Sequence, residues 1–164
     1  MKNGFTLIEL LVTLAIAAIL LTTAIPSFRE IIRNNQLTTQ ANNLVTALHL
    51  ARSEAVKRRT RVAVCAGTTA AGCTGGWNDG WIVFVDADGG CNYDAGTDVI
   101  LRASGGLQKG AAMAAAPACL GFQRSGYSIS NAAETFTLCN SSVGKSRVMT
   151  VEGVGHIRTT TGSC

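Results

Sequence analysis

The feature that most constrains this chain is an almost uncharged apolar run at its start. Between Phe5 and Ile25 the one charged residue is Glu9. A helix of about 20 apolar residues spans the hydrocarbon core of a bilayer. Lys2, on the short leading side, predicts a cytoplasmic N-terminus and places everything after Pro26 outside the cytoplasm. The sequence therefore predicts a single membrane-spanning helix with Glu9 near its cytoplasmic edge.

The acid in this run requires a partner or a function. A carboxylate within a bilayer costs roughly 2.5–3.5 kcal/mol on insertion scales. A secretory signal peptide is one interpretation, since Thr22-Thr23-Ala24 offers a weak cleavage signal, but an acid inside the apolar core argues against it. A plain membrane anchor explains the length of the run and leaves Glu9 without a role.

The residues around the acid favour a third interpretation. Lys2-Asn3-Gly4, followed by Phe5-Thr6-Leu7-Ile8-Glu9, resembles the leader and cleavage site of the type IV prepilins. The resemblance implies that a prepilin peptidase cuts after Gly4 and that Phe5 becomes an N-methylated N-terminus. It also implies a filament in which Glu9 pairs with the terminal amine of a neighbouring Phe5, and such a buried ion pair is suited to setting register. A tolerated interfacial acid is the alternative.

The remainder of the chain has room for one small domain. The 164 residues leave roughly 100–130 residues for it, within the usual single-domain range. We expect a leader at 1–4, a membrane-spanning or filament-core helix at 5–26, an amphipathic second half of that helix at 27–60, and a β-rich periplasmic head at 61–164. The net charge of +4 predicts only weak attraction to polyanions.

Six cysteines follow the apolar run, none of them in a C-x-x-C pair: Cys65, Cys73, Cys91, Cys119, Cys139 and Cys164. An even number in a small extracytoplasmic domain predicts disulfides, with fifteen possible pairings. Proximity favours a bond from Cys65 to Cys73 and another from Cys139 to Cys164. Cys91 and Cys119 are then left for each other. A zinc site is the alternative, but the chain has only two histidines and neither is next to a cysteine.

A helical pattern continues beyond the apolar run. Apolar residues recur at alternating steps of four and three, which places them along one seam of a helix. These residues are Leu37, Ala41, Leu44, Leu48, Ala51 and Ala55. We predict one helix over about residues 5–58, with the seam against a sheet and a bend at Pro26, whose ring removes a backbone donor.

The pattern changes to strands after Arg61. Short β-branched and aromatic runs separated by glycine-rich turns predict strands at 61–66, 81–85, 99–103, 135–139, 147–151 and 156–159. The glycine- and alanine-rich stretch 105–118 predicts an irregular connection. A helix followed by successive strands predicts an α+β domain with one antiparallel sheet packed on the helix.

Several internal motifs resemble one branch of the pilin superfamily. Ala51-Arg52-Ser53-Glu54-Ala55, then Trp77-Asn78-Asp79-Gly80-Trp81, then Val83-Phe84-Val85-Asp86-Ala87-Asp88, are similar to the GspH/FimT family of minor pilins and pseudopilins. The resemblance implies a type IV pilin-like fold, with a long N-terminal helix and a β-rich head. It also implies a bacterial inner-membrane protein that later enters a pilus or pseudopilus.

Two internal motifs have a structural and a functional interpretation. Residues 86–94 carry oxygen ligands at alternate positions, as an EF-hand loop does, but lack the terminal glutamate and have the glycine in the wrong place. We favour a hairpin loop held by Cys91. For Trp77 and Trp81 we favour packing over the sheet rather than stacking on a ligand.

The C-terminal segment carries candidate DNA-binding residues: Lys145, Arg147, His156 and Arg158. DNA-binding members of the family have a Gly-Arg-x-Arg motif, and the matching positions here are Gly155-His156-Ile157-Arg158. Histidine replaces the first arginine and is a weaker phosphate ligand near pH 7. The alternative is a solvated edge whose charges keep strands from aggregating.

We predict a structural protein without catalysis, because no set of nucleophile, base and orienting group is apparent and no cofactor or metal is indicated. The favoured function is a minor pilin that enters or primes a type IV pilus. A type II secretion pseudopilin and a DNA receptor for natural transformation are the alternatives. The partners implied are other pilin subunits, the prepilin peptidase and methyltransferase, an inner-membrane assembly platform and, in the third case, double-stranded DNA.

Overall fold

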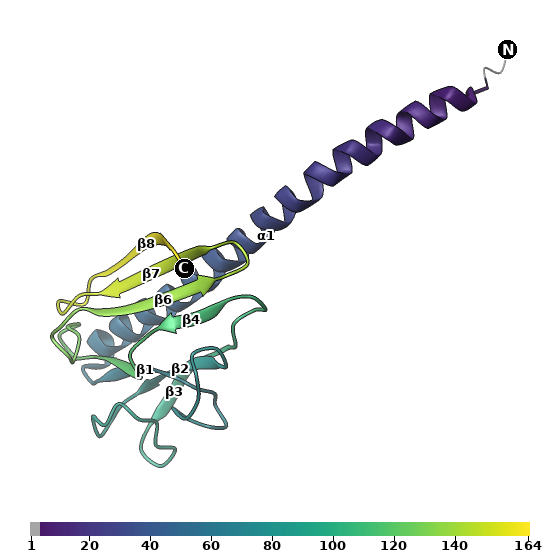
Figure 1. Ribbon diagram of the computed structural model, residues 1–164. Helices are drawn as coiled ribbons and strands as arrows, with labels where there is room; N and C mark the ends of the chain where they lie inside the picture. The colour runs from purple at the N-terminus through teal and green to yellow at the C-terminus, as the bar shows by residue number, and fades with distance from the viewer. Residues whose placement is uncertain (1–3) are drawn as a thin grey trace.

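The computed structural model describes residues 4–164 and consists of one long helix and a β-rich head (Figure 1). Helix α1 spans Leu7–Arg58, close to the predicted 5–58. Its N-terminal half projects from the head, and its C-terminal half lies against the strands. Residues 1–3, most of the predicted leader, lie outside the described part of the chain.

The sequence accounts for both ends of α1. Thr6 is extended, and its hydroxyl accepts a hydrogen bond from the Glu9 amide at 3.3 Å, so Thr6 is the N-cap. The helix ends at Arg59, which adopts a left-handed conformation with φ of 54°. Between these ends α1 continues unbroken through Pro26. A bend at Pro26 stays a prediction.

Eight strands follow: β1 (Val62–Ala66), β2 (Gly80–Val85), β3 (Val99–Gly105), β4 (Ala112–Ala115), β5 (Cys119–Phe122), β6 (Glu134–Asn140), β7 (Lys145–Val151) and β8 (Ile157–Ser163). They form two four-stranded antiparallel sheets, in the orders β3-β2-β1-β5 and β4-β6-β7-β8. The six predicted strands are all present. The prediction of a single sheet is wrong, because β5 returns to pair with β1 while β6 begins a second sheet.

Two short strands account for the other error. β4 lies inside the segment 105–118 that the sequence analysis treats as irregular, and β5 follows directly after it. Both are short and carry alanine or glycine, which have low strand propensity. They become strands because the edges of β6 and β1 are open to pair with them.

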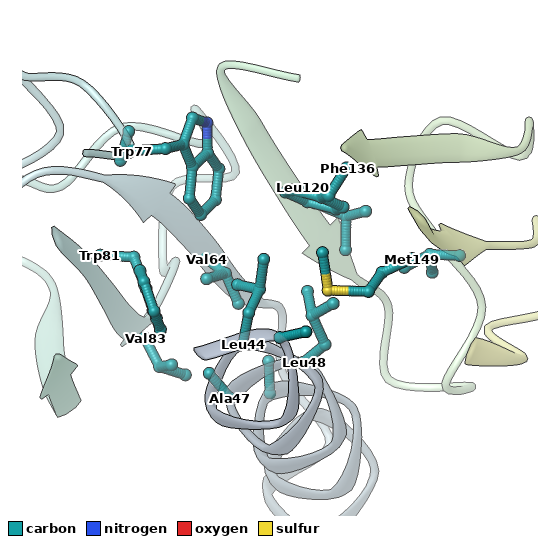
Figure 2. Packing of buried hydrophobic residues seen from close by; sticks show 14 of the residues in the cluster. Leu44, Ala47, Leu48, Val64, Trp77, Trp81, Val83, Leu120, Phe136 and Met149 are labelled. Carbon is teal, nitrogen blue, oxygen red and sulfur yellow. The ribbon is translucent and has the colours of Figure 1, made fainter. Parts of the chain in front are cut away.

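Both sheets pack on the same seam of α1. All six seam residues predicted from the sequence are buried, and they form one core with residues of both sheets. In Figure 2, Leu44 and Leu48 lie between Val64 of the first sheet and Met149 of the second. The helix therefore joins the two sheets.

The tryptophans belong to this core. The ring of Trp77 meets that of Phe136 edge-on, with 5.0 Å between ring centroids, and its indole nitrogen donates to the Pro117 carbonyl at 2.8 Å. Trp81 is buried on β2. Packing over the sheet therefore describes both side chains.

A second, smaller core lies on the other face of the first sheet. Ala63, Cys65, Ile82 and Phe84 are fully buried there, beneath loops that include Tyr93. Two disulfides hold these loops to the sheet: Cys65 is bonded to Cys73, and Cys91 to Cys119. A third bond, from Cys139 to Cys164, ties the C-terminus to β6. Proximity in the sequence favours two of these pairs, Cys65–Cys73 and Cys139–Cys164, and elimination leaves the third.

Candidate functional site: the exposed helix and the basic residues

The N-terminal half of α1 is an exposed apolar surface. Its large apolar side chains are exposed from Leu7 to Ile32, and Phe5, just before the helix, is 76% exposed. Burying such side chains is worth roughly 25 cal/mol per Å² of apolar area. The segment is long and apolar enough to cross a membrane. A surface of this kind requires a bilayer or neighbouring helices around it.

Glu9 lies in the first turn of α1, with an exposed side chain. No hydrogen bond or ion pair of its carboxylate is present among residues 4–164. The Thr6-x-x-Glu9 spacing is that of a capping box, a signal for the helix start that the sequence analysis missed. Gly4 and Phe5 precede the cap and lie outside the helix. The predicted cleavage point therefore lies just before the first turn of the helix.

Lys145 and Arg147 face α1. The Lys145 ammonium lies 3.0 Å from a Glu30 carboxylate oxygen. The Arg147 guanidinium donates to Asn34 Oδ1 at 2.8 Å and to Thr38 Oγ1 at 3.1 Å. Asn34 and Thr38 therefore lie on the face of α1 that β7 contacts. These two cations attach the head to the helix.

His156 and Arg158 lie elsewhere. In the register of β7 and β8, Arg158 is opposite Thr150, whereas Arg147 is opposite Thr161. Because alternate residues of a strand point to opposite faces, Arg158 is on the other face of the sheet from Arg147. His156 is exposed in the turn, 3.9 Å from Glu152. Of the four candidate DNA-binding residues, the structure brings only Lys145 and Arg147 together.

Arg52 explains the glycine of the C-terminal motif. Its Nε donates to the Gly126 carbonyl at 3.0 Å, and an Nη donates to the Val154 carbonyl at 3.2 Å. A side chain at Gly155, where φ is +79°, would collide with that Gly126 carbonyl and with Arg52. Gly155 is thus needed for packing whether or not DNA binds. The sequence offers one indication of the role of Arg52, since this residue directly follows Ala51, a residue of the buried seam.

The acidic loop between β2 and β3 closes on itself. Asp86 and Asp98 are buried and accept backbone amide hydrogens, Asp86 from Cys91 and Asp98 from Ala87 and Asp94. Burial raises the pKa of Asp86, although Arg61, 3.6 Å away, opposes the shift. These carboxylates organise the loop that Cys91 holds in place, which agrees with the hairpin interpretation of the sequence.

Comparison with known proteins identifies the family of this chain. Residues 40–155 match the family model described as type II transport protein GspH. The chain belongs to the GspH family. Residues 1–25 of this family member match the prokaryotic N-terminal methylation motif. A search of curated proteins returned no significant match.

Solved structures agree with the family. The type IV minor pilin FimU of Pseudomonas aeruginosa has a TM-score of 0.61 and 26% identity, covering 79% of this chain and 92% of FimU. A second crystal form of FimU gives 0.58. The minor pseudopilin EpsH of the Vibrio cholerae type 2 secretion system has a TM-score of 0.53 and 14% identity, covering 76% of this chain and 96% of EpsH, and shows the shared fold.

The GspH-family chain is therefore a structural subunit of the minor pilin and pseudopilin class, with the predicted α+β fold. Membership and the methylation motif imply assembly with other pilin subunits and processing by a prepilin peptidase. The family resemblance read from the sequence is confirmed.

Proposed function

We propose that this chain is a minor pilin that enters or primes a type IV pilus through α1, while its head makes side or tip contacts. The observation that carries the proposal is the exposed apolar half of α1 and, in its first turn, an acid whose carboxylate has no partner among residues 4–164. Similarity to FimU at 26% identity over most of both chains supports the pilus. The family description, which names type II transport, supports the pseudopilin alternative.

The steps before assembly follow from the N-terminus. The prepilin peptidase cuts between Gly4 and Phe5, on the cytoplasmic side of the inner membrane, and Phe5 is then N-methylated. Until assembly, α1 holds the chain in the inner membrane with the head in the periplasm. An oxidising compartment of that kind suits the three disulfides.

Glu9 sets the register by pairing with the amine of a neighbouring Phe5. Glu9→Ala is expected to leave the head folded and to remove the chain from sheared filaments. Glu9→Gln is the sharper variant, because glutamine can also serve in a capping box but carries no charge. It should fail like Glu9→Ala if the ion pair matters. Wild-type recovery of Glu9→Gln in filaments would show that the acid acts only as a local cap.

Deletion phenotypes separate the pilus from the secretion system. Loss of twitching with normal exoprotein secretion is the expected result, and the reverse pattern would assign the chain to a type II secretion system. Neighbouring genes offer a second test, since other minor pilins are expected beside this one.

DNA binding stays a prediction of the C-terminal motif. Its test is the retardation of double-stranded DNA at two salt concentrations, since phosphate contacts weaken steeply with salt. No retardation at low salt would remove this function. His156→Arg, which restores the family motif, should strengthen any binding that is present.

A further inference from the structure

A basic pocket lies at the C-terminal end of α1, the end opposite the projecting N-terminal half of the helix. Its volume is about 430 Å³. Three arginines line it, and they come from three segments: the C-cap of α1, the residue before β1 and the loop after β5. They are Arg59, Arg61 and Arg124. None of them belongs to the candidate DNA-binding set.

The pocket carries an excess of positive charge. The side chains of Arg59 and Arg124 are exposed and have no hydrogen bond or ion pair with any of residues 4–164. Arg61 is 3.6 Å from Asp86, the acid in the lining, and its Nε makes no hydrogen bond within that part of the chain. The lining thus contains three arginines and one carboxylate.

The backbone at Arg59 indicates that this side chain is needed. Its φ of 54° and ψ of 34° are left-handed, a conformation that helix ends usually give to glycine or asparagine. A bulky residue held there is a reason to look for a function. A cation does favour the C-terminus of a helix, but Lys57 and Arg58 already supply charge to the last turn.

Arg61 has a prepared position. Its guanidinium packs on Gly89, where φ is +82° and where any side chain would collide with Nη1. The same guanidinium forms an ion pair with the buried Asp86 carboxylate. The acidic loop therefore orients an arginine of the neighbouring pocket.

We propose that this pocket binds a phosphate group. Arginine presents a planar fork of donors that matches phosphate oxygens in pairs, and charge-assisted hydrogen bonds of this kind are stronger than neutral ones. Three such forks from separate segments suit one tetrahedral anion better than a flat surface would. The ligand is either the free ion or a phosphodiester chain that reaches this end of the head. The proposal does not depend on whether the chain serves a pilus or a secretion system.

The test titrates the full chain in detergent micelles with inorganic phosphate by calorimetry, at constant ionic strength held with chloride. Saturable binding is expected. Arg124→Gln should weaken it about tenfold, the effect of losing one charge-assisted hydrogen bond. Arg102→Gln is the matched control, because it removes an exposed arginine from β3, outside the pocket, and should leave the affinity unchanged.

Arg59→Gly separates binding from folding. Glycine relieves the left-handed backbone, so this variant should unfold at a higher temperature than the wild type while it binds phosphate more weakly. Absence of saturable phosphate binding would overturn the proposal, as would equal weakening by Arg102→Gln. A glutamate peptide that binds when phosphate does not would assign the pocket to an acidic protein instead.

A 12-nucleotide oligothymidylate distinguishes the two sources of phosphate. If it binds and Arg124→Gln weakens it, the pocket takes phosphodiester chains. If only inorganic phosphate binds, the ligand is the free ion. Either result supports the phosphate site.

Discussion

Arg52 holds two loops of the head to the end of α1, and its replacement should be costly. Arg52→Ala removes a part-buried bond to the Gly126 carbonyl and an exposed bond to the Val154 carbonyl. Hydrogen bonds to charged groups contribute roughly 1.5–3 kcal/mol when shielded and less when exposed to water. We therefore expect a loss of about 2 kcal/mol. In a chain of this length that lowers the unfolding midpoint by roughly 4–8 °C.

Near-ultraviolet circular dichroism of the full chain in detergent measures this loss, because Trp77 and Trp81 are buried in the core that melts. Arg52→Lys retains the charge but cannot reach both carbonyls from one ammonium, so it should lose at least half as much stability. Arg102→Ala removes an exposed arginine of β3 and should change stability by no more than about 0.5 kcal/mol.

Two results would refute this reasoning. An Arg52→Ala midpoint within about 2 °C of wild type would mean that the two bonds only replace equivalent bonds to water. A full rescue by lysine would assign the effect to charge at the helix C-terminus and not to the carbonyl contacts.

Further consequences concern the buried acid, the C-terminal disulfide and the core. Because burial raises the pKa of Asp86 above 3.8, the folded state binds its proton more tightly, and wild-type stability should fall as pH rises from 3.8 through the raised pKa. The free energy of unfolding of Asp86→Asn, relative to that of the wild type, should therefore be higher at about pH 7 than at about pH 4. The same difference between the two proteins at both pH values would contradict this. Replacing both Cys139 and Cys164 with serine opens a bond across a separation of 25 residues and should cost roughly 3 kcal/mol in denaturant unfolding; a loss under about 1 kcal/mol would mean that the strands alone fix the C-terminus. Leu44→Ala should lower the free energy of unfolding by about 2–5 kcal/mol in the same assay, because it leaves a cavity between the two sheets. An unchanged free energy of unfolding would disprove that packing.

The long helix was predictable because its signals are local. Glycine and proline are absent from Ser27 to Arg61, and the apolar seam at steps of four and three specifies both the helix and its buried face there. The six longer strands have β-branched and aromatic residues of their own. β4 has none, and β5 has only Phe122. These two strands form because strands far away in the sequence leave open edges.

The basic residues show where sequence reasoning stops. Lys145, Arg147 and Arg158 lie on two adjacent strands, and proximity in the chain suggested one surface. Whether two residues share a face depends on the register between strands, and a shift of one residue reverses the answer. The turn that fixes this register includes Gly155, whose role becomes visible only beside Arg52 and Gly126.

The contacts of Lys145 and Arg147 with α1 have a mechanical consequence. The buried seam begins at Leu37, but these contacts reach back to Glu30. They lengthen the part of α1 that the head contacts by about 10 Å, at 1.5 Å per residue. The part of α1 that projects beyond these contacts is roughly 35 Å long, which is about the thickness of one bilayer. Pro26 lies one helical turn before Glu30, so the projecting segment meets the head next to the proline.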